Sequence, residues 1–349
     1  MKPVLFVTGH VAADRAGAFE LLHERVPIEL ALYGGRHQHG TPPKAPPAAV
    51  PHRYVDQREI GPLVASGAYR AVVVGTGGRL ALPGAWRAAR RSAVPFVFWA
   101  ALWRTPRTAA HLAAMPLMRR IYRDADAIVT YGEHVSAYVR RHGATRVLVA
   151  PQAVDNRFWA AAATPRTDER FAALFVGRPA REKGLAVALA AWRRAGLDGT
   201  LTVVGDHPGL PADVVAAGHL DPAGVRNFYG VCDVLVVPSV STRRFIEPWG
   251  LVVNEAMNQG VAIVASNAVG AAAGGLVQHG RNGLIVRQGD SAALAEALAA
   301  LAGDRARCAA LGAAGREDVS AYTYERWADA FADALNLSPP SAPAGSVAR

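Results

Sequence analysis

Two glutamates in the second half of the chain flank a turn that could hold a polar ligand. The segment 245–257 reads Phe-Ile-Glu-Pro-Trp-Gly-Leu-Val-Val-Asn-Glu-Ala-Met. Pro248 and Gly250 interrupt any helix through Glu247, so we expect Glu247 on a loop just before a helix that carries Glu255. Amides at a helix N-terminus attract phosphate, and a carboxylate beside them suits sugar hydroxyls. The same spacing fits an acidic residue that only stabilises the helix, so the pair alone leaves both interpretations open.

Two cations lie on a strand-to-helix turn earlier in the same half. The segment 175–184 reads Phe-Val-Gly-Arg-Pro-Ala-Arg-Glu-Lys-Gly. Gly177 ends a predicted strand, and Arg178 and Lys183 follow it on the turn. Arginine can bind a phosphate through two hydrogen bonds, whereas lysine acts as a point charge. The Walker pattern GxxxxGK[ST] is absent, and a solvated basic turn is the alternative interpretation.

Short β-branched runs alternate with longer helical patterns along the chain, which predicts βαβ units and parallel sheets. With 349 residues, two domains are expected. We therefore predict an α/β fold of two Rossmann-like, doubly wound domains that face each other across a cleft, where ligands bind beyond the carboxyl ends of the strands. The predicted strands are Val4–Thr8, Ile28–Tyr33, Ala71–Gly75, Pro95–Trp99, Ala127–Thr130, Val147–Ala150, Ala172–Val176, Thr200–Val204, Val234–Val237, Val261–Ala265 and Gly283–Arg287.

The predicted domain boundaries follow changes in composition. Helices are predicted at Gly84–Arg91, Thr108–Asp124, Glu133–His142, Gly184–Ala195, Pro222–Val231, Leu251–Gln259, Ser291–Ala302 and Tyr324–Leu335. The proline-rich stretch 36–51 is expected to be a surface loop. The last predicted helix carries Trp327 and Phe331 four residues apart, an apolar stripe that must dock, and we expect it to return to the first domain. The expected divisions are a first domain at 1–160, a linker at 161–170, a second domain at 171–320, the returning helix at 321–337 and a disordered tail at 338–349.

The net charge of +10 is compatible with nucleic acid, an anionic membrane surface or an anionic small substrate as partner. No nucleic-acid-binding motif is present and the arginines are scattered, so we expect no nucleic acid partner. The basic, apolar helix 108–123 fits either a peripheral contact with an anionic membrane or simple packing on the first sheet. The two cysteines lack metal-binding spacing, and the apolar runs are too short for a signal peptide or a membrane span. We expect a cytoplasmic protein, with peripheral contact at the inner face of the membrane left open.

Together these segments resemble the retaining glycosyltransferase family 4, of the GT-B architecture. The motifs that carry the resemblance occur in the family's order and cover most of 171–301: G-R-x4-K-G at Gly177–Gly184, V-V-G-D at Val203–Asp206, V-L-V-V-P-S ending at Ser239, E-x7-E at Glu247 and Glu255, V-x-G-A at Val269–Ala272 and N-G-L-I-V at Asn282–Val286. The segment Pro-Gln-Ala-Val-Asp at 151–155 also resembles the end of the family's first domain.

The resemblance implies a nucleotide-diphosphate sugar as donor, a hydroxyl acceptor, retention of anomeric configuration, and no metal or other cofactor. It implies that Arg178 and Lys183 hold the diphosphate and that Glu255 binds the ribose. Glu247 would face the donor sugar, and we take Glu247, Arg178 and Lys183 as the catalytic residues. The resemblance also assigns to the donor Gly177, which precedes the turn that carries Arg178 and Lys183. It places Asp206, His219 and Leu220 towards the base, and Pro248, Trp249, Gly250 and Leu251 at the junction of phosphate and sugar.

The first half matches the family only in pattern and lacks a histidine that family members often carry near the donor sugar. Trp99, Trp103 or Arg104 occupies that region, and we expect these residues to contact the acceptor. Core packing of both tryptophans is the alternative interpretation. Gly9 and His10 follow the first strand, where an acceptor loop is expected. The expected acceptor is a lipid-linked or envelope glycan or a small metabolite. A sugar-nucleotide epimerase of the same architecture and an inactive sugar-nucleotide-binding protein remain alternatives.

Overall fold

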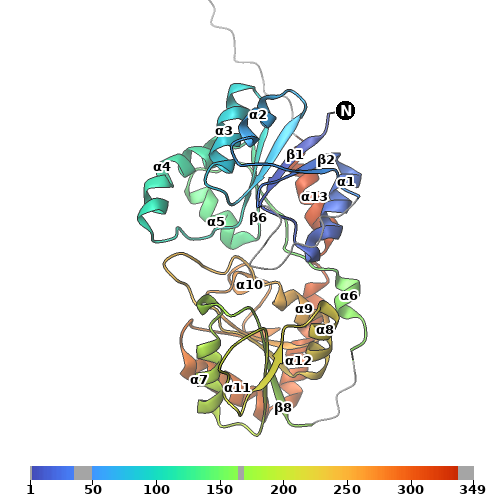
Figure 1. Cartoon of the computed structure of the whole chain (residues 1–349). Coiled ribbons are helices and arrows are strands. Elements are labelled where there is room, and N and C mark those ends of the chain that lie inside the picture. The colour runs from blue at the N-terminus through green and yellow to red at the C-terminus, as the bar shows by residue number, and fades with distance from the viewer. Residues whose placement is uncertain (1, 35–48, 164–168, 337–349) are drawn as a thin grey trace, which may run out of the picture.

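The computed structural model describes residues 2–34, 49–163 and 169–336, which form two α/β domains stacked end to end (Figure 1). This two-domain, doubly wound architecture confirms the predicted fold class. Most of the predicted loop 36–51, part of the predicted linker 161–170 and the predicted tail 338–349 lie outside the described residues.

The first domain is built on a parallel sheet of seven strands in the order β3-β2-β1-β4-β5-β6-β7. Its central strands are buried along their whole length, which explains their unbroken apolar sequences. The strands are β1 (Val4–Thr8), β2 (Ile28–Leu32), β3 (His52–Tyr54), β4 (Ala71–Gly75), β5 (Phe96–Ala100), β6 (Ala127–Thr130) and β7 (Val147–Val149).

Helices cover both faces of this sheet and enclose two apolar clusters. One face carries α1 (Ala16–Arg25) and α13 (Tyr324–Leu335), as Figure 1 also shows. The other face carries α2 (Ile60–Ala65), α3 (Ala81–Arg91), α4 (Ala109–Asp124) and α5 (Glu133–Arg141).

The second domain is built on a parallel sheet of six strands in the order β10-β9-β8-β11-β12-β13. Its strands are β8 (Phe171–Val176), β9 (Gly199–Val204), β10 (Val215–Gly218), β11 (Val234–Val237), β12 (Ala262–Ser266) and β13 (Gly283–Val286). The helices around it are α6 (Asn156–Ala160), α7 (Leu185–Ala195), α8 (Pro222–Val231), α9 (Val252–Asn258), α10 (Gly270–Ala273), α11 (Ser291–Gly303) and α12 (Arg305–Val319).

The chain returns from the second domain to the first through α13. Trp327 and Phe331 lie in the same apolar cluster as Phe6 and Trp99, with ring centroids of Phe331 and Trp99 5.7 Å apart. The hydroxyl of Tyr324 donates a hydrogen bond to the carbonyl of Asp14. The last helix is therefore part of the first domain's core, although it follows the second domain in sequence.

The elements that sequence patterns did not predict are short or carry weak apolar signals. Strands β3 and β10 are edge strands whose residues are mostly exposed, so they lack an apolar run. Helices α1, α2, α6, α10 and α12 were also not predicted. The buried face of α12 includes Gly312, where an added Cβ would come within 1.9 Å of the Gly260 carbonyl oxygen. A face of small residues permits this close approach but gives no hydrophobic periodicity.

Candidate active site

An ion pair between Lys183 and Glu247 lies at the carboxyl edge of the second sheet. Lys183 ends a short 3-10 turn, Arg181–Lys183, between β8 and α7, and Glu247 lies on the loop between β11 and α9. The Nζ atom of Lys183 is 2.6 Å from Oε2 of Glu247, whose side chain is only 9% exposed. The structure thus joins two of the three residues predicted to be catalytic, which are 64 positions apart in sequence.

The backbone fixes this turn against the neighbouring strand. Gly184 has φ +75°, and a Cβ there would lie 2.0 Å from the carbonyl oxygen of Pro238, just after β11. Only glycine therefore allows α7 to begin at this position. The third predicted catalytic residue, Arg178, instead bonds Glu182 on its own turn, with Nη2 2.6 Å from Oε1. The structure does not place the Arg178 guanidinium in contact with the Lys183–Glu247 pair.

The loop of Pro248, Trp249 and Gly250 joins Glu247 to α9 and packs closely against α10. A Cβ at Gly270, the first residue of α10, would come within 1.9 Å of the Pro248 carbonyl oxygen, and the Ala271 amide donates to the Trp249 carbonyl at 2.8 Å. Gly250 has φ +97°, a conformation that favours glycine. Leu251 is the residue that precedes α9. The predicted turn before the helix is therefore confirmed, and its position is set by close packing.

Glu255 lies on α9 beside Tyr229, whose hydroxyl donates to Oε2 of Glu255 at 2.8 Å. Burial is the main cause that raises the pKa of Glu255 to about 7, and the nearby Asp14 of the first domain acts in the same direction, whereas the hydrogen bond from Tyr229 and the charge of Lys183 oppose the shift. A carboxyl group that titrates near neutral pH can accept hydrogen bonds from a ligand once it ionises.

The residues predicted to surround a nucleotide base come together at three glycine turns. The Gly205 amide donates to the Gly218 carbonyl at 2.7 Å, and a Cβ at Gly205 would come within 2.1 Å of the Gly177 carbonyl oxygen. Asp206 and His219 are exposed beside these turns. Leu220, in contrast, packs against an apolar cluster of the second domain.

The residues predicted to contact the acceptor take different positions in the first domain. Trp99 is 5% exposed and packs in the core. Gly9 and His10 follow β1, with the Gly9 carbonyl held by the Gly34 amide at 2.7 Å. Core packing, the alternative interpretation for Trp99, is what the structure gives.

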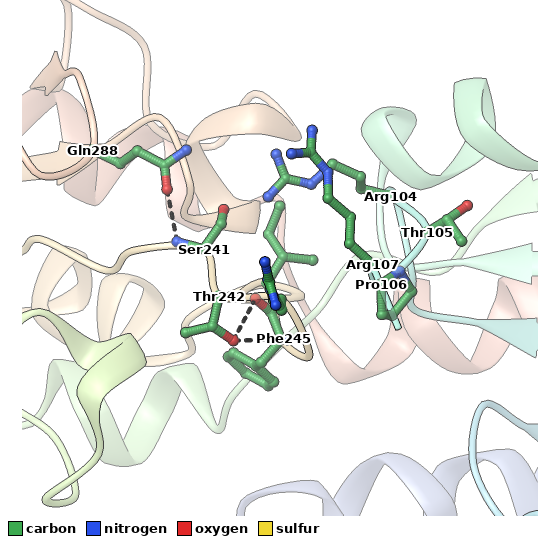
Figure 2. Close-up of a pocket in the computed structure, with 10 residues that line it drawn as sticks. Arg104, Thr105, Pro106, Arg107, Ser241, Thr242, Phe245 and Gln288 are labelled. Carbon is green, nitrogen blue, oxygen red and sulfur yellow. Dashed lines mark hydrogen bonds between the residues drawn. The ribbon is translucent and has the colours of Figure 1, made fainter. Parts of the chain in front are cut away.

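Trp103 and Arg104 lie at the boundary between the domains. The indole Nε1 of Trp103 donates to the backbone carbonyl of Glu247 at 3.1 Å, so a first-domain side chain holds the loop of the ion pair. Arg104 lines a cavity of about 380 Å³ that lies between loop 104–107 of the first domain and loop 241–246 of the second (Figure 2). The Arg107 amide also bonds the Arg243 carbonyl across this boundary at 2.8 Å.

His134, which sequence reasoning did not single out, also holds the loop. Its Nε2 lies 3.1 Å from the Pro248 carbonyl oxygen, and its ring centroid is 5.4 Å from that of Trp103 and 5.9 Å from that of Trp249. Burial lowers the pKa of His134, so the imidazole is neutral and Nε2 donates to Pro248. His134 is the second residue of a helix in the first domain. Nothing in the neighbouring sequence indicates that its side chain contacts the second domain.

A further set of hydrogen bonds joins the domains beneath this loop. The Trp249 indole donates to Oδ1 of Asn254 at 2.8 Å, and the Asn254 amide donates to the Gln152 carbonyl at 2.8 Å. Arg15 of the first domain in turn donates to Oε1 of Gln152. These contacts connect the loop of the predicted donor site to the chain segment between the domains.

Residues 2–34, 49–163 and 169–336 contain no cluster of three or more His, Cys, Asp or Glu side chains suited to a metal ion. None of the helices in this part of the chain is both long and apolar enough to span a membrane.

Two facing doubly wound domains, with the polar residues at the carboxyl edge of the second sheet, define the GT-B class of fold. Solved structures of this class align over nearly the whole chain. HepE from Anabaena in complex with UDP aligns with a TM-score of 0.76 and 17% identity, over 95% of this chain and 99% of that chain. Sucrose-phosphate synthase from Thermosynechococcus elongatus aligns with a TM-score of 0.72 and 20% identity, over 96% and 98%. These likenesses establish the fold.

The second domain matches a known protein family in sequence. Residues 170–304 match the family Glycosyl transferases group 1, which confirms the resemblance drawn from the motifs. A GDP-mannose-dependent alpha-(1-6)-phosphatidylinositol monomannoside mannosyltransferase from Mycobacterium tuberculosis is 32% identical over 188 residues, which are 49% of this chain and 48% of the relative. An alpha-maltose-1-phosphate synthase from Mycolicibacterium smegmatis is 31% identical over 207 residues, 49% and 51% of the two chains. The matched region thus spans about half the length of these curated relatives.

Proposed function

We propose that the chain is a retaining glycosyltransferase that moves a hexose from a nucleotide-diphosphate sugar to a hydroxyl acceptor. The observation that carries the proposal is the Lys183–Glu247 ion pair at the sheet edge. Glu255 lies on α9, the helix that follows Glu247. The family match of 170–304 supports a sugar-nucleotide ligand for this domain, and both named relatives are sugar-transferring or sugar-phosphate-forming enzymes by name.

The chemistry assigned to these residues follows from charge. Transfer breaks the bond between the anomeric carbon and the diphosphate oxygen, and the acceptor oxygen forms a new bond to that carbon. Negative charge grows on the departing diphosphate, and the acceptor's proton passes to one of its oxygens. In the proposal, Lys183 and Arg178 stabilise this charge without a metal, and a missing contact of this kind costs about 10²–10³-fold in turnover.

Glu247 and Glu255 take different roles in the proposed complex. In the complex, the Glu247 carboxylate accepts hydrogen bonds from sugar hydroxyls. Lys183, its partner in the free protein, turns towards the diphosphate. Glu255 accepts hydrogen bonds from the ribose. A pair of glycosidase carboxylates must flank the scissile bond on either side. Two glutamates on one loop and the helix directly after it suit donor binding better.

The peripheral membrane contact belongs to the same proposal. The exposed side of α4 carries Leu112, which is 60% exposed, together with the exposed Arg119, Arg120 and Arg123. Apolar and basic side chains on one helix suit the surface of an anionic bilayer. We propose that the protein works in the cytoplasm, with α4 resting on the inner face of the membrane.

The test measures whether the purified protein releases nucleoside diphosphate from a sugar donor. The protein is incubated with UDP-glucose or GDP-mannose, with and without a membrane extract as acceptor source. The proposal expects release that depends on the extract and on Glu247, lost in Glu247→Gln. Conversion of the donor to another sugar nucleotide without an acceptor would favour the epimerase instead, and binding without turnover would favour the inactive binding protein.

A further inference from the structure

A second concentration of positive charge lies across the domain boundary from the donor residues. The cavity of about 380 Å³ shown in Figure 2 is lined by Arg104 and Arg107 from the first domain and by Arg243 from the second. Figure 2 shows the Arg104 and Arg107 side chains extending towards the second-domain loop. The described residues that line it include no aspartate or glutamate.

No carboxylate of the described residues forms an ion pair with the guanidinium groups of Arg104, Arg107 and Arg243. Three uncompensated cations around one small space repel one another and favour an anion as occupant. Arginine in particular binds phosphate through paired hydrogen bonds.

One neutral group of the cavity wall, the Ser241 hydroxyl, also lacks a partner among the described residues. Its oxygen is buried. The Ser241 amide is held by Oε1 of Gln288 at 2.6 Å, which fixes the loop that carries the hydroxyl.

Each wall of the cavity contains a residue that is next in sequence to a residue of the proposed donor site or of its support. Arg104 follows Trp103, whose indole bonds the Glu247 carbonyl, and Ile246, which lines the cavity, precedes Glu247. Neither Lys183 nor Glu255 lines it, so the cavity is separate from the diphosphate residues. A molecule held there lies next to the donor sugar, where an acceptor must be.

The basic surface continues on the first domain. A neighbouring cavity of about 860 Å³ shares Arg104 and Arg107 and adds Arg119, Arg123 and Arg141, again with no acidic residue among the described residues that line it. Arg104 and Arg107 line both cavities, so loop 104–107 lies between two cavities with positively charged walls. This arrangement suits a ligand group that carries more than one negative charge.

We propose that the acceptor carries a phosphate group, and that Arg104, Arg107 and Arg243 bind this group across the domain boundary while its hydroxyl faces the donor. This inference rests on the proposed function and names the class of its acceptor. Because the two domains each supply part of the site, the phosphate also helps to hold them in the arrangement needed for transfer.

The test is calorimetric titration of the full chain with two phosphate probes, first with the donor site saturated by the nucleoside diphosphate that it binds. Glycerol 3-phosphate represents a free phosphate ester, with glycerol as its neutral control. Vesicles of phosphatidic acid in phosphatidylcholine represent a lipid headgroup, with pure phosphatidylcholine as control. We expect the wild type to bind at least one of the probes. Binding of the first identifies a soluble phosphate. Binding of the vesicles alone identifies a lipid headgroup if the cavity variants below weaken it, because α4 can also contact an anionic bilayer.

The variants assign the binding to the cavity. We expect Arg104→Gln/Arg107→Gln and, separately, Arg243→Gln to raise the Kd for the probe about tenfold or more. The matched control is Arg193→Gln/Arg194→Gln, which removes two exposed arginines from α7 and should leave the Kd unchanged. The bond between the Arg107 amide and the Arg243 carbonyl uses only backbone atoms, so these substitutions leave it in place.

The outcomes separate the inference from the function on which it rests. Absence of binding for both probes, or equal Kd values in the cavity and control variants, overturns the phosphate site. If no nucleoside diphosphate binds, the proposed donor site is wrong, and the same titrations without nucleotide still decide the arginine cavity.

Discussion

At the scale of single residues, the site is organised by a charge pair that a ligand must rearrange. Lys183 and Glu247 neutralise each other at 2.6 Å in a position where Glu247 is nearly buried. Removal of one member leaves a poorly hydrated charge without a partner, which is costly. The residue types and spacing predicted that Lys183 and Glu247 belong to one site. The bond between them could not be predicted, because it depends on how α7 and the 241–250 loop pack at the end of β11.

Glu255 gives a pH-dependent prediction at the same scale. If its carboxylate accepts hydrogen bonds from a nucleotide, binding releases the proton that a pKa of about 7 retains in the free protein. We therefore expect nucleoside diphosphate affinity to rise as pH increases from 6 to 8, as titrations across that range would measure. In Glu255→Gln this part of the pH dependence should disappear. Identical pH profiles for the two proteins would contradict the role.

At the scale of elements, the loop before α9 belongs to the second domain but is held by two side chains of the first. His134 at the start of α5 and Trp103 after β5 bond the carbonyls of Pro248 and Glu247. Sequence patterns predicted β5, α5 and α9 closely, because β5 is an unbroken apolar run, α5 is amphipathic, and Pro248 and Gly250 mark where α9 begins. They missed β10 and α12, whose signals are weak, and they could not predict a contact such as that of His134, which depends on the relative placement of two domains.

His134 predicts a loss of stability in acid. Its lowered pKa means that the folded state favours the neutral ring, so its contribution is full above the ordinary value of 6.5 and is lost as pH falls below it. We expect the free energy of unfolding of the wild type to fall more steeply below pH 6.5 than that of His134→Gln, which keeps a donor but does not titrate. Denaturant unfolding at a series of pH values would show this. Parallel curves would contradict the neutral contact.

The exposed side of α4 predicts vesicle binding. Leu112→Asp replaces an exposed apolar side chain by a charge that anionic lipid repels, so we expect weaker co-flotation with phosphatidylglycerol vesicles. The control Leu80→Asp changes another exposed leucine, outside α4, and should have no effect. Equal flotation of the two variants would remove α4 from the membrane proposal.

At the scale of the whole molecule, the chain crosses between the domains twice, and α13 completes the first domain's core after the second domain has been built. The aromatic stripe of Trp327 and Phe331 was recognisable in the sequence as a surface that must dock. The two doubly wound sheets were also predictable, since buried parallel strands have nearly continuous apolar sequences. The cationic cavity was not, because Arg104, Arg107 and Arg243 meet only when the domains face each other.

Phe331→Ala tests this arrangement. Phe331 is fully buried beside Phe6 and Trp99, so truncation should cost about 3–5 kcal/mol of unfolding free energy. Hydrogen exchange should quicken in β1 of the first domain rather than in β8 of the second. Leu298→Ala, in the second domain's core on α11, should give the opposite distribution. Faster exchange in β8 alone for Phe331→Ala would contradict the returning helix.

The central claim is that Lys183 and Glu247 form the core of a nucleotide-diphosphate-sugar site. Its most direct test is calorimetric binding of UDP, GDP, ADP and dTDP to the wild type, to Lys183→Gln and to Arg181→Gln. Arg181 is an exposed cation on the same turn and matches the charge removed. We predict that at least one diphosphate binds the wild type, that Lys183→Gln weakens it about tenfold or more, and that Arg181→Gln leaves it unchanged. Failure of all four to bind, or equal affinities in the two variants, would contradict the account.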